Sequence, residues 1–248
     1  MLGIIGGTGL SQLENLKVNR RQLMRTPYGE PSGPLTFGEI GGHEVIFLPR
    51  HGNGHTIPPH AVNYRANLWA LQAENVKSIV AVASVGGIID DLEPGKIVLP
   101  DQIIDYTHGR KNSFFDGTDQ LVRHIDFTQP YCQKLRMLCK RAASHANQVL
   151  IDGGVYAAVQ GPRLETAAEI NKLERDGATM VGMTGMPEAA LARELEINYA
   201  AICPVANYAA GRGSSKNEIK YEEIGKKLGE TMGQVRLLIE QVVLLYAD

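Results

Sequence analysis

Two segments of the sequence carry groups that suit an anion. Gly6–Gly9 is a glycine-rich turn (GGTG) whose backbone N–H groups can approach an anion closely, with the Thr8 hydroxyl beside them. Arg50 and His51 directly follow an apolar run, and a guanidinium presents a planar fork of donors that fits phosphate. The turn lacks the spacing of a dinucleotide fingerprint and the lysine of a P-loop. Taken alone, it is equally well a tight connection between a strand and a helix.

Neither the histidines nor the cysteines of the chain predict a metal site. Near His51 the sequence also contains His43, His55 and His60. They lie in a loop rich in glycine and proline, without the helical frame and glutamate of a zinc protease, so a solvated loop is the simpler interpretation. The cysteines are Cys132, Cys139 and Cys203. They form no CxxC pair, and we expect reduced thiols, as in a cytosolic protein.

Three further polar residues stand where strands give way to helices or turns. Glu165 follows a Gly-Pro pair in AAVQGPRLETAAEI, Glu188 falls in the first turn of a predicted helix, and Asn207 lies in VANYAAG. Each has a structural explanation, because the helix dipole favours an acid at a helix start and asparagine favours turns. Glu188 could instead bind a sugar hydroxyl, and position alone leaves both interpretations open.

Alternating strands and helices must position these residues. Apolar runs predict strands at 2–5, 44–49, 78–85, 96–106, 156–159, 179–182 and 199–204, and helical spacing predicts helices at 63–76, 133–145, 166–175, 187–194 and 221–246. This alternation is typical of an α/β fold with a mixed or parallel sheet flanked by helices. In such sheets ligands bind beyond the carboxyl ends of the strands, where most of the glycine-rich and polar segments fall. We find no repeats or linkers and therefore expect residues 1–248 to form one domain.

Composition excludes several classes of protein. Apolar residues make up 44% of the 248 residues and charged residues 21%, close to the globular average, and the net charge is −2. The chain has no excess of positive charge that would attract nucleic acid, so an anionic ligand would have to be held by local donors. The N-terminal MLGIIGGTG lacks the features of a signal peptide, and no window approaches the apolar length of a membrane span. We therefore expect a cytoplasmic protein with no membrane or nucleic-acid partner.

Taken together, these segments resemble the purine nucleoside phosphorylase / methylthioadenosine phosphorylase family over nearly the whole chain. The matching blocks, in order, are IIGGTGL, RHGNGHTIPPHAVNYRANLWAL, DQIIDYT, HIDFTQPYC, GPRLETAAEI, GMTGMPEAALARE and the ANY segment. So many collinear blocks are specific, although any single one is not. The resemblance implies a phosphorylase-type α/β fold and a homotrimer with active sites at subunit contacts. It also implies inorganic phosphate as a co-substrate, without a cofactor or metal.

The resemblance also implies roles for individual residues. The positions that match phosphate contacts are Thr8, Arg50, His51, Ser84, Val85 and Thr184. At 84–85 the methylthioadenosine enzymes usually carry Thr-Ala. Met183 matches a residue that packs on the ribose, and His124 matches a histidine that reaches the neighbouring subunit's pocket near the 5′ substituent. Glu188 stands in the family's Pro-Glu motif.

The base-binding segments depart from the adenine-specific pattern. Those members carry Ser-Ser after GPRF and an Asp-Tyr-Asp triplet, whereas this chain has Leu164-Glu165-Thr166 and Asn207-Tyr208-Ala209. Glu165 and Asn207 are the pair that resembles the 6-oxopurine phosphorylases. A carboxylate only accepts hydrogen bonds, so it fits the N1–H of hypoxanthine and faces a lone pair in adenine. Such a mismatch can cost on the order of 10⁴ in discrimination. For Glu165 the alternative remains an acid that stabilises a helix start.

At the 5′ end of the nucleoside the comparable stretch is KNEIKYEEIGKKL. Phosphorylases that use a free 5′-hydroxyl resemble one another in having a histidine near the C-terminal helix, and here the nearest position is Ile219, with Tyr221 as the alternative. A methylthio group favours apolar contacts over a hydrogen-bond donor. The base and 5′ positions together predict 5′-methylthioinosine as the substrate.

The expected reaction is therefore phosphorolysis of 5′-methylthioinosine to hypoxanthine and 5-methylthioribose 1-phosphate. Asn207 and Glu165 are expected to stabilise the departing base. Three alternatives share much of the same sequence pattern: a methylthioadenosine phosphorylase, an inosine/guanosine phosphorylase and a non-catalytic nucleoside-binding protein. A hydrolase is a weaker alternative, because it would not need the Arg-His-Thr anion set.

Overall fold

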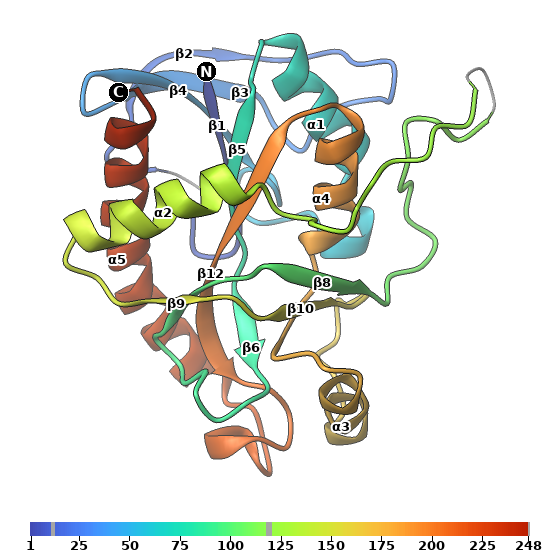
Figure 1. Cartoon of the computed structure of the whole chain (residues 1–248). Helices are drawn as coiled ribbons and strands as arrows, with labels where there is room; N and C mark the ends of the chain where they lie inside the picture. The colour runs from blue at the N-terminus through green and yellow to red at the C-terminus, as the bar shows by residue number, and fades with distance from the viewer. Residues whose placement is uncertain (11–12, 118–120, 248) are drawn as a thin grey trace.

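A mixed sheet forms the centre of the molecule (Figure 1). The computed structural model describes residues 1–248 except 11–12, 118–120 and 248, and except the side chains of residues 221 and 223. Within this part of the chain the strands are β1 (Leu2–Gly6), β2 (Lys17–Gln22), β3 (Leu35–Ile40), β4 (His43–Pro49), β5 (Ser78–Val82), β6 (Val85–Gly87), β7 (Ile97–Leu99), β8 (Gln102–Asp105), β9 (Leu150–Asp152), β10 (Val155–Ala158), β11 (Met180–Gly182) and β12 (Asn198–Tyr208). Their order is β2-β3-β4-β1-β5-β12-β6-β11-β10-β8, with β7 paired to β12 and β9.

Helices cover both faces of this sheet. They are α1 (Tyr64–Ala73), α2 (Gln133–His145), α3 (Ala167–Arg175), α4 (Gly185–Glu194) and α5 (Tyr221–Ala247). In Figure 1, α2 and α5 lie together on one side, and α1 and α4 lie together on the other. Strand β1 separates the two apolar cores, since Ile4 packs on the side of α2 and α5 and Ile5 on the side of α1 and α4. A strand with both faces covered is apolar throughout, as the sequence pattern predicts.

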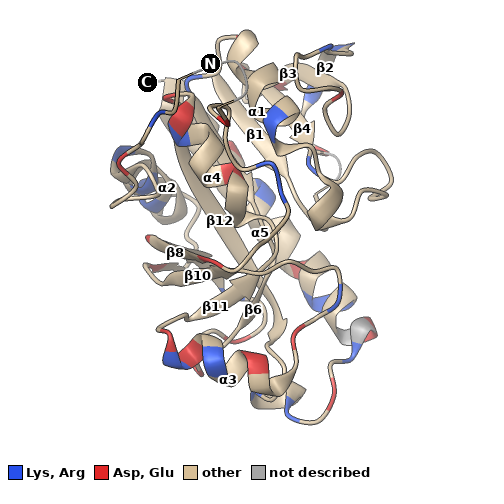
Figure 2. Ribbon diagram, turned by 90° about the vertical axis from the view of Figure 1, so that its right-hand side faces the viewer, with Lys and Arg blue, Asp and Glu red and all other residues tan. Residues whose placement is uncertain are grey.

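The fold confirms the predicted α/β class with a mixed sheet. β1 pairs in parallel with β4 and β5, whereas β2, β3 and β4 pair antiparallel. Helix α3 lies apart from the two main layers. In Figure 2 its ribbon carries several charged positions, whereas strands β1, β5 and β12 carry none. No described helix combines the length and apolar character needed to cross a membrane.

The sequence pattern missed some strands and merged others. β2 is exposed and polar along nearly its whole length, so it lacks the apolar alternation by which a strand is recognised. The predicted strand at 78–85 is two strands, β5 and β6, and the one at 96–106 is β7 and β8 with Pro100 between them. Proline has no N–H to give to a ladder, so it marks the break between strands.

Candidate active site

A cavity of about 680 Å³ lies where several strands end. Gly7 follows β1, Arg50 follows β4, Ala83 follows β5 and Met183 follows β11, and all four residues line it. The residues predicted from sequence that line this cavity are Thr8, Arg50, His51, Ser84, Val85, Leu164, Glu165, Met183, Thr184, Asn207 and Ala209. The structure thus brings together residues drawn from most of the length of the chain.

Arg50 lines the cavity and is completely buried. Its Nε and Nη2 donate to the two carboxylate oxygens of Glu188, each over 2.7 Å, and its Nη1 donates to the Val82 carbonyl over 2.8 Å. Burial alone would lower the pKa of Arg50, but the Glu188 carboxylate overcomes this and holds it above its ordinary value. The guanidinium is therefore charged and fixed in orientation.

Glu188 binds Arg50 and does not face a sugar. The carboxylate has no exposed surface and does not line the cavity. One of its oxygens, Oε1, also accepts from the Tyr199 hydroxyl over 2.8 Å. The sugar-hydroxyl interpretation of Glu188 is therefore wrong, because both of its oxygens already have buried donors.

Gly7 allows the first turn to approach Arg50. A Cβ atom at this position would lie 2.4 Å from the Val82 carbonyl oxygen and 2.8 Å from Arg50 Nη1, too close for either. The glycine in the turn is thus required by the proximity of backbone and guanidinium.

His51 is held as a neutral ring. Its Nδ1 lies 2.8 Å from the Ile57 carbonyl oxygen, which only accepts, so Nδ1 carries the hydrogen and Nε2 a lone pair. Burial, with a smaller contribution from the charge of Arg50, lowers the pKa of His51 to about 4. At neutral pH it therefore adds no second positive charge to the cavity.

Thr184 stands where β11 passes into α4. Its N–H donates to the buried Tyr156 hydroxyl over 3.3 Å. Two residues later the chain is not helical, since Met186 has φ −121° and ψ 141°. This kink lies between Thr184 and the part of α4 that carries Glu188.

Glu165 lines the cavity and takes no part in capping α3. That helix is capped by Thr166, whose hydroxyl and N–H pair reciprocally with Glu169. Burial is the main reason that the pKa of Glu165 is raised above its ordinary value of 4.5. The structural role considered for this acid, at the helix start, belongs to other residues.

Asn207 owes its direction to an irregularity in β12. The pairing of β12 with β6 shifts register between Val205 and Asn207, which marks a β-bulge, and bulges re-aim side chains. Its Nδ2 donates to the Tyr208 carbonyl over 2.7 Å, which fixes the orientation of the amide. One amide hydrogen and the oxygen Oδ1 remain for a ligand.

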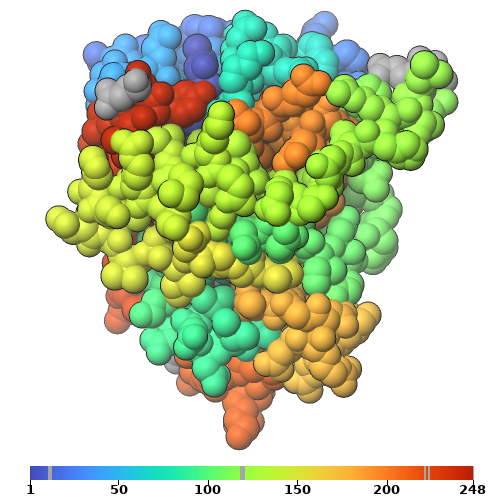
Figure 3. All heavy atoms as spheres, in the orientation of Figure 1, coloured from blue at the N-terminus to red at the C-terminus, as the bar shows by residue number. Residues whose placement is uncertain are grey.

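Three residues expected at the substrate do not line this cavity. Tyr208 follows Asn207 on β12 and points to the opposite side, where its hydroxyl donates to the Asp90 carbonyl. His124 is exposed on the segment between β8 and α2, which projects from the body of the molecule (Figures 1 and 3). Ile219 lines a neighbouring cavity instead, and the side chain of Tyr221, the alternative to Ile219, lies outside the described residues.

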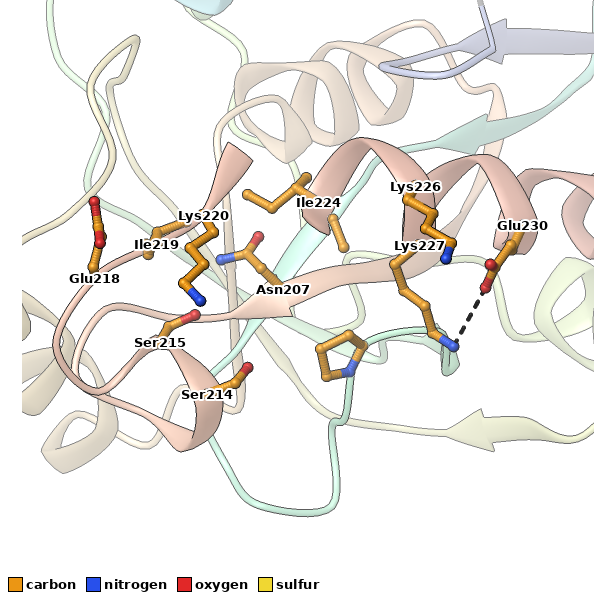
Figure 4. Close-up of a pocket in the computed structure, with 12 residues that line it drawn as sticks. Asn207, Ser214, Ser215, Glu218, Ile219, Lys220, Ile224, Lys226, Lys227 and Glu230 are labelled. Carbon is orange, nitrogen blue, oxygen red and sulfur yellow. Dashed lines mark ion pairs between the residues drawn. The ribbon is translucent and has the colours of Figure 1, made fainter. Parts of the chain in front are cut away.

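Figure 4 shows the neighbouring cavity, which has a volume of about 390 Å³. Both cavities are lined by Ala206, Asn207 and Ile224. Its outer part is polar and includes an ion pair between Lys227 and Glu230 at 3.6 Å. Asn207 therefore stands on the wall that the two cavities share.

Sequence reasoning missed several residues of the main cavity, among them two apolar residues of α5, and it also missed Arg110, which lies outside the cavity lining. Ile224 and Leu228 lie one turn apart on α5 and line the cavity. Their i, i+4 spacing looks like that of core positions, so the pattern alone gave no functional signal. Arg110 does not line the cavity, but its guanidinium donates to the backbone carbonyls of Val159, Gln160, Met183 and Met186 and to the Gln160 side chain.

Comparison with known proteins identifies the family of this chain. The sequence model of the phosphorylase superfamily matches residues 1–243, and the chain belongs to this superfamily. A probable S-methyl-5′-thioinosine phosphorylase from Pseudomonas syringae pv. tomato is 49% identical over 97% of both chains. A probable 6-oxopurine nucleoside phosphorylase from Thermococcus kodakarensis is 41% identical over 98% of this chain and 91% of its own. The structure of methylthioadenosine phosphorylase from Schistosoma mansoni in complex with adenine superposes with a TM-score of 0.93, at 31% identity, covering 99% of this chain and 91% of its own.

Proposed function

We propose that this protein catalyses phosphorolysis of S-methyl-5′-thioinosine to hypoxanthine and 5-methylthioribose 1-phosphate. The observation that carries the proposal is that Glu165 and Asn207 line one cavity with Arg50, His51 and Thr184. The first two suit a 6-oxopurine, and the other three suit phosphate. The relatives named for S-methyl-5′-thioinosine and for 6-oxopurine nucleosides support the same substrate class.

The reaction needs no covalent enzyme intermediate. A phosphate oxygen attacks C1′ of the ribose while the bond to N9 of the purine lengthens, through an oxocarbenium-like state. The electron pair of that bond goes to the base, and the proton that phosphate loses ends on the base. Arg50, Thr8 and Thr184 hold the phosphate in place, so catalysis depends on positioning and fixed dipoles.

Asn207 and Glu165 bind two different edges of the base. Because Nδ2 of Asn207 is held by the Tyr208 carbonyl, Oδ1 is free to accept from a protonated N7, and the second amide hydrogen is free for O6. The Glu165 carboxylate accepts from N1–H. Adenine offers a lone pair at N1 and an amine at C6, so it meets the wrong partner at both positions.

Ile224 and Leu228 take the place first given to Ile219. Both are apolar and line the same cavity as the base-binding and phosphate-binding residues. We assign the 5′-methylthio group to them, because a thioether gains from apolar contact and a free hydroxyl would lose its water there.

We further propose that residues 1–248 act as one domain in a cytoplasmic homotrimer. The superfamily match over residues 1–243 supports the single domain, and three free thiols suit a reducing compartment. Exposed Leu121 and Val122 stand beside His124 on the projecting segment, as expected if this segment contacts a second subunit. Analytical ultracentrifugation of the wild-type chain tests the trimer, and a monomer would contradict it.

One substrate panel tests the proposed activity. Methylthioinosine, methylthioadenosine, inosine and guanosine are each incubated with and without phosphate, and released base is measured. We expect phosphate-dependent release that is fastest with methylthioinosine. Preference for methylthioadenosine or for inosine would support the corresponding alternative phosphorylase, and release without phosphate would indicate a hydrolase. No release at all would indicate a binding protein.

A double substitution tests the base assignment. Glu165→Ser combined with Asn207→Asp replaces the acceptor facing N1 and the amide beside it with the groups found in adenine-specific members. We expect the ratio of kcat/KM for methylthioadenosine to that for methylthioinosine to rise by about 10² or more. An unchanged ratio would contradict the base-binding roles of these two residues.

A further inference from the structure

A buried polar cluster supports the phosphate end of the cavity from behind. It joins Arg50, which follows β4, to Glu188 on α4, 138 residues later in the chain, and to Tyr199 on β12, the strand that follows α4. All three side chains are at least nine-tenths buried. Tyr199 also stacks on Tyr131, with ring centroids 6.1 Å apart.

The cluster fixes the guanidinium plane. The two oxygens of Glu188 accept hydrogen bonds from Nε and Nη2, each over 2.7 Å, and the Val82 carbonyl accepts one from Nη1 over 2.8 Å. A guanidinium has five N–H groups, so one remains on each of Nη1 and Nη2 for the cavity that Arg50 lines. This bidentate ion pair fixes the direction of the remaining donors, which a single hydrogen bond would not do.

The same carboxylate allows the cation to stay buried when no anion is bound. A guanidinium removed from water without a partner is strongly unfavourable, so it would otherwise turn toward solvent. The Tyr199 hydroxyl donates to Oε1 of Glu188 over 2.8 Å and holds the carboxylate in turn.

We propose that Glu188, supported by Tyr199, is a positioning residue for phosphate: it aims the free N–H groups of Arg50 at the anion without contacting substrate itself. This inference rests on the proposed function. It predicts that changes at Glu188 and Tyr199 impair the use of phosphate and spare the use of nucleoside.

The first test compares two buried acids on the same helix. In Glu188→Gln an amide NH₂ replaces one oxygen and faces a guanidinium N–H, so one of the two hydrogen bonds of the ion pair is lost. We expect KM for phosphate to rise by about tenfold or more, with KM for methylthioinosine changed less than about twofold. Glu194→Gln is the matched control, because Glu194 is also buried on α4 but accepts from Ser113 and the Phe114 N–H. This control should change neither KM.

The second test compares the two stacked tyrosines. Tyr199→Phe removes the hydroxyl that holds Glu188 while keeping the ion pair, so KM for phosphate should rise by a smaller factor, about threefold to tenfold. Tyr131→Phe removes a buried hydroxyl that has no hydrogen-bond partner among the described residues, and it should leave both constants unchanged. If Glu188→Gln does not fold, this tyrosine pair decides the question.

Arg50→Met separates this inference from the proposed function. If Arg50→Met retains phosphorolysis, the phosphate site itself is misassigned and the proposed function fails. If Arg50→Met abolishes phosphorolysis while Glu188→Gln and Tyr199→Phe leave KM for phosphate unchanged or lower it, only the positioning role is overturned. Equal changes in the constants for phosphate and nucleoside would also overturn it, since they would indicate general structural damage.

Discussion

Thr166 and Glu169 hydrogen-bond each other across the first turn of α3. The Glu169 N–H donates to Thr166 Oγ1 over 3.1 Å, and the Thr166 N–H donates to Glu169 Oε2 over 2.7 Å. This pair satisfies two N–H groups at the start of the helix, those of Thr166 and Glu169. Glu165, one residue earlier, takes no part in this cap and lines the cavity, where burial raises its pKa.

Glu165→Gln should stabilise the unliganded protein while impairing catalysis. Because the pKa of Glu165 is raised in the folded state, the folded protein binds more protons than the unfolded one, and the free energy of unfolding falls as pH rises from below 4.5 through the raised pKa. Replacing the carboxylate with a neutral amide removes the loss of stability that ionisation of Glu165 causes. Thermal unfolding should show a higher Tm for the variant at pH 7 and a smaller difference at pH 4.

Glu169→Gln is the control, for which we expect the opposite change in Tm. The Arg163 guanidinium, followed by the Thr166 N–H, lowers the pKa of Glu169 to about 2. Its ionised form therefore stabilises the fold, and this contribution is lost as pH falls from 4.5 toward 2. The variant should have a lower Tm at pH 7. If both variants shift Tm in the same direction, the assigned environment of Glu165 is incorrect.

Phosphorolysis of 6-oxopurine nucleosides should decline in acid as Glu165 takes up a proton. The ionised carboxylate accepts from N1–H more strongly than the protonated acid does, so protonation weakens this contact. Burial raises the pKa of Glu165 above the ordinary 4.5. We expect an acid limb in log kcat/KM for methylthioinosine with its midpoint above that value. Glu165→Gln should lose this limb along with most of its activity, and a wild-type profile that stays flat down to pH 4.5 would contradict the role.

Ile224→Asn should weaken the preference for a methylthio group. The substitution places a polar amide where the apolar side chains of α5 line the cavity, so kcat/KM for methylthioinosine relative to inosine should fall by about tenfold. Leu237→Asn, on an exposed position of the same helix, is the control and should leave the ratio unchanged. Equal ratios in both variants would place the 5′ group elsewhere.

Arg110→Met should disturb nucleoside binding from outside the cavity. All five guanidinium N–H groups of Arg110 have partners. These lie just after β10, just after β11 and in the first turn of α4, on the segments that carry Met183 and lead to Glu165. We expect a lower Tm and a KM for methylthioinosine raised about tenfold, because several partly buried carbonyls lose their donor. Added guanidinium ion at millimolar concentration should restore part of the activity. Failure of rescue together with an unchanged KM would contradict this.

The local pattern of the sequence predicts most elements that build the site. Apolar runs mark β1, β4 and β12, and helical spacing marks α1, α2 and α5 within a few residues. The misses have physical reasons. The exposed edge strand β2 has no apolar face. The break between β5 and β6 falls at Ala83 and Ser84, where neither glycine nor proline marks the end of a strand.

For the candidate site, too, local sequence predicts one part and tertiary packing decides the other. The sequence by itself determined the chemistry available: a glycine turn, an Arg-His pair, and an acid and an amide suited to a 6-oxopurine edge. Only the tertiary structure decided that Arg50 is held by Glu188, that Ile224 replaces Ile219 at the cavity, and that Asn207 faces it while Tyr208 does not. The reason is that residue type and spacing fix local conformation, whereas a partner distant in the chain and the side to which a bulged strand turns depend on how the layers pack.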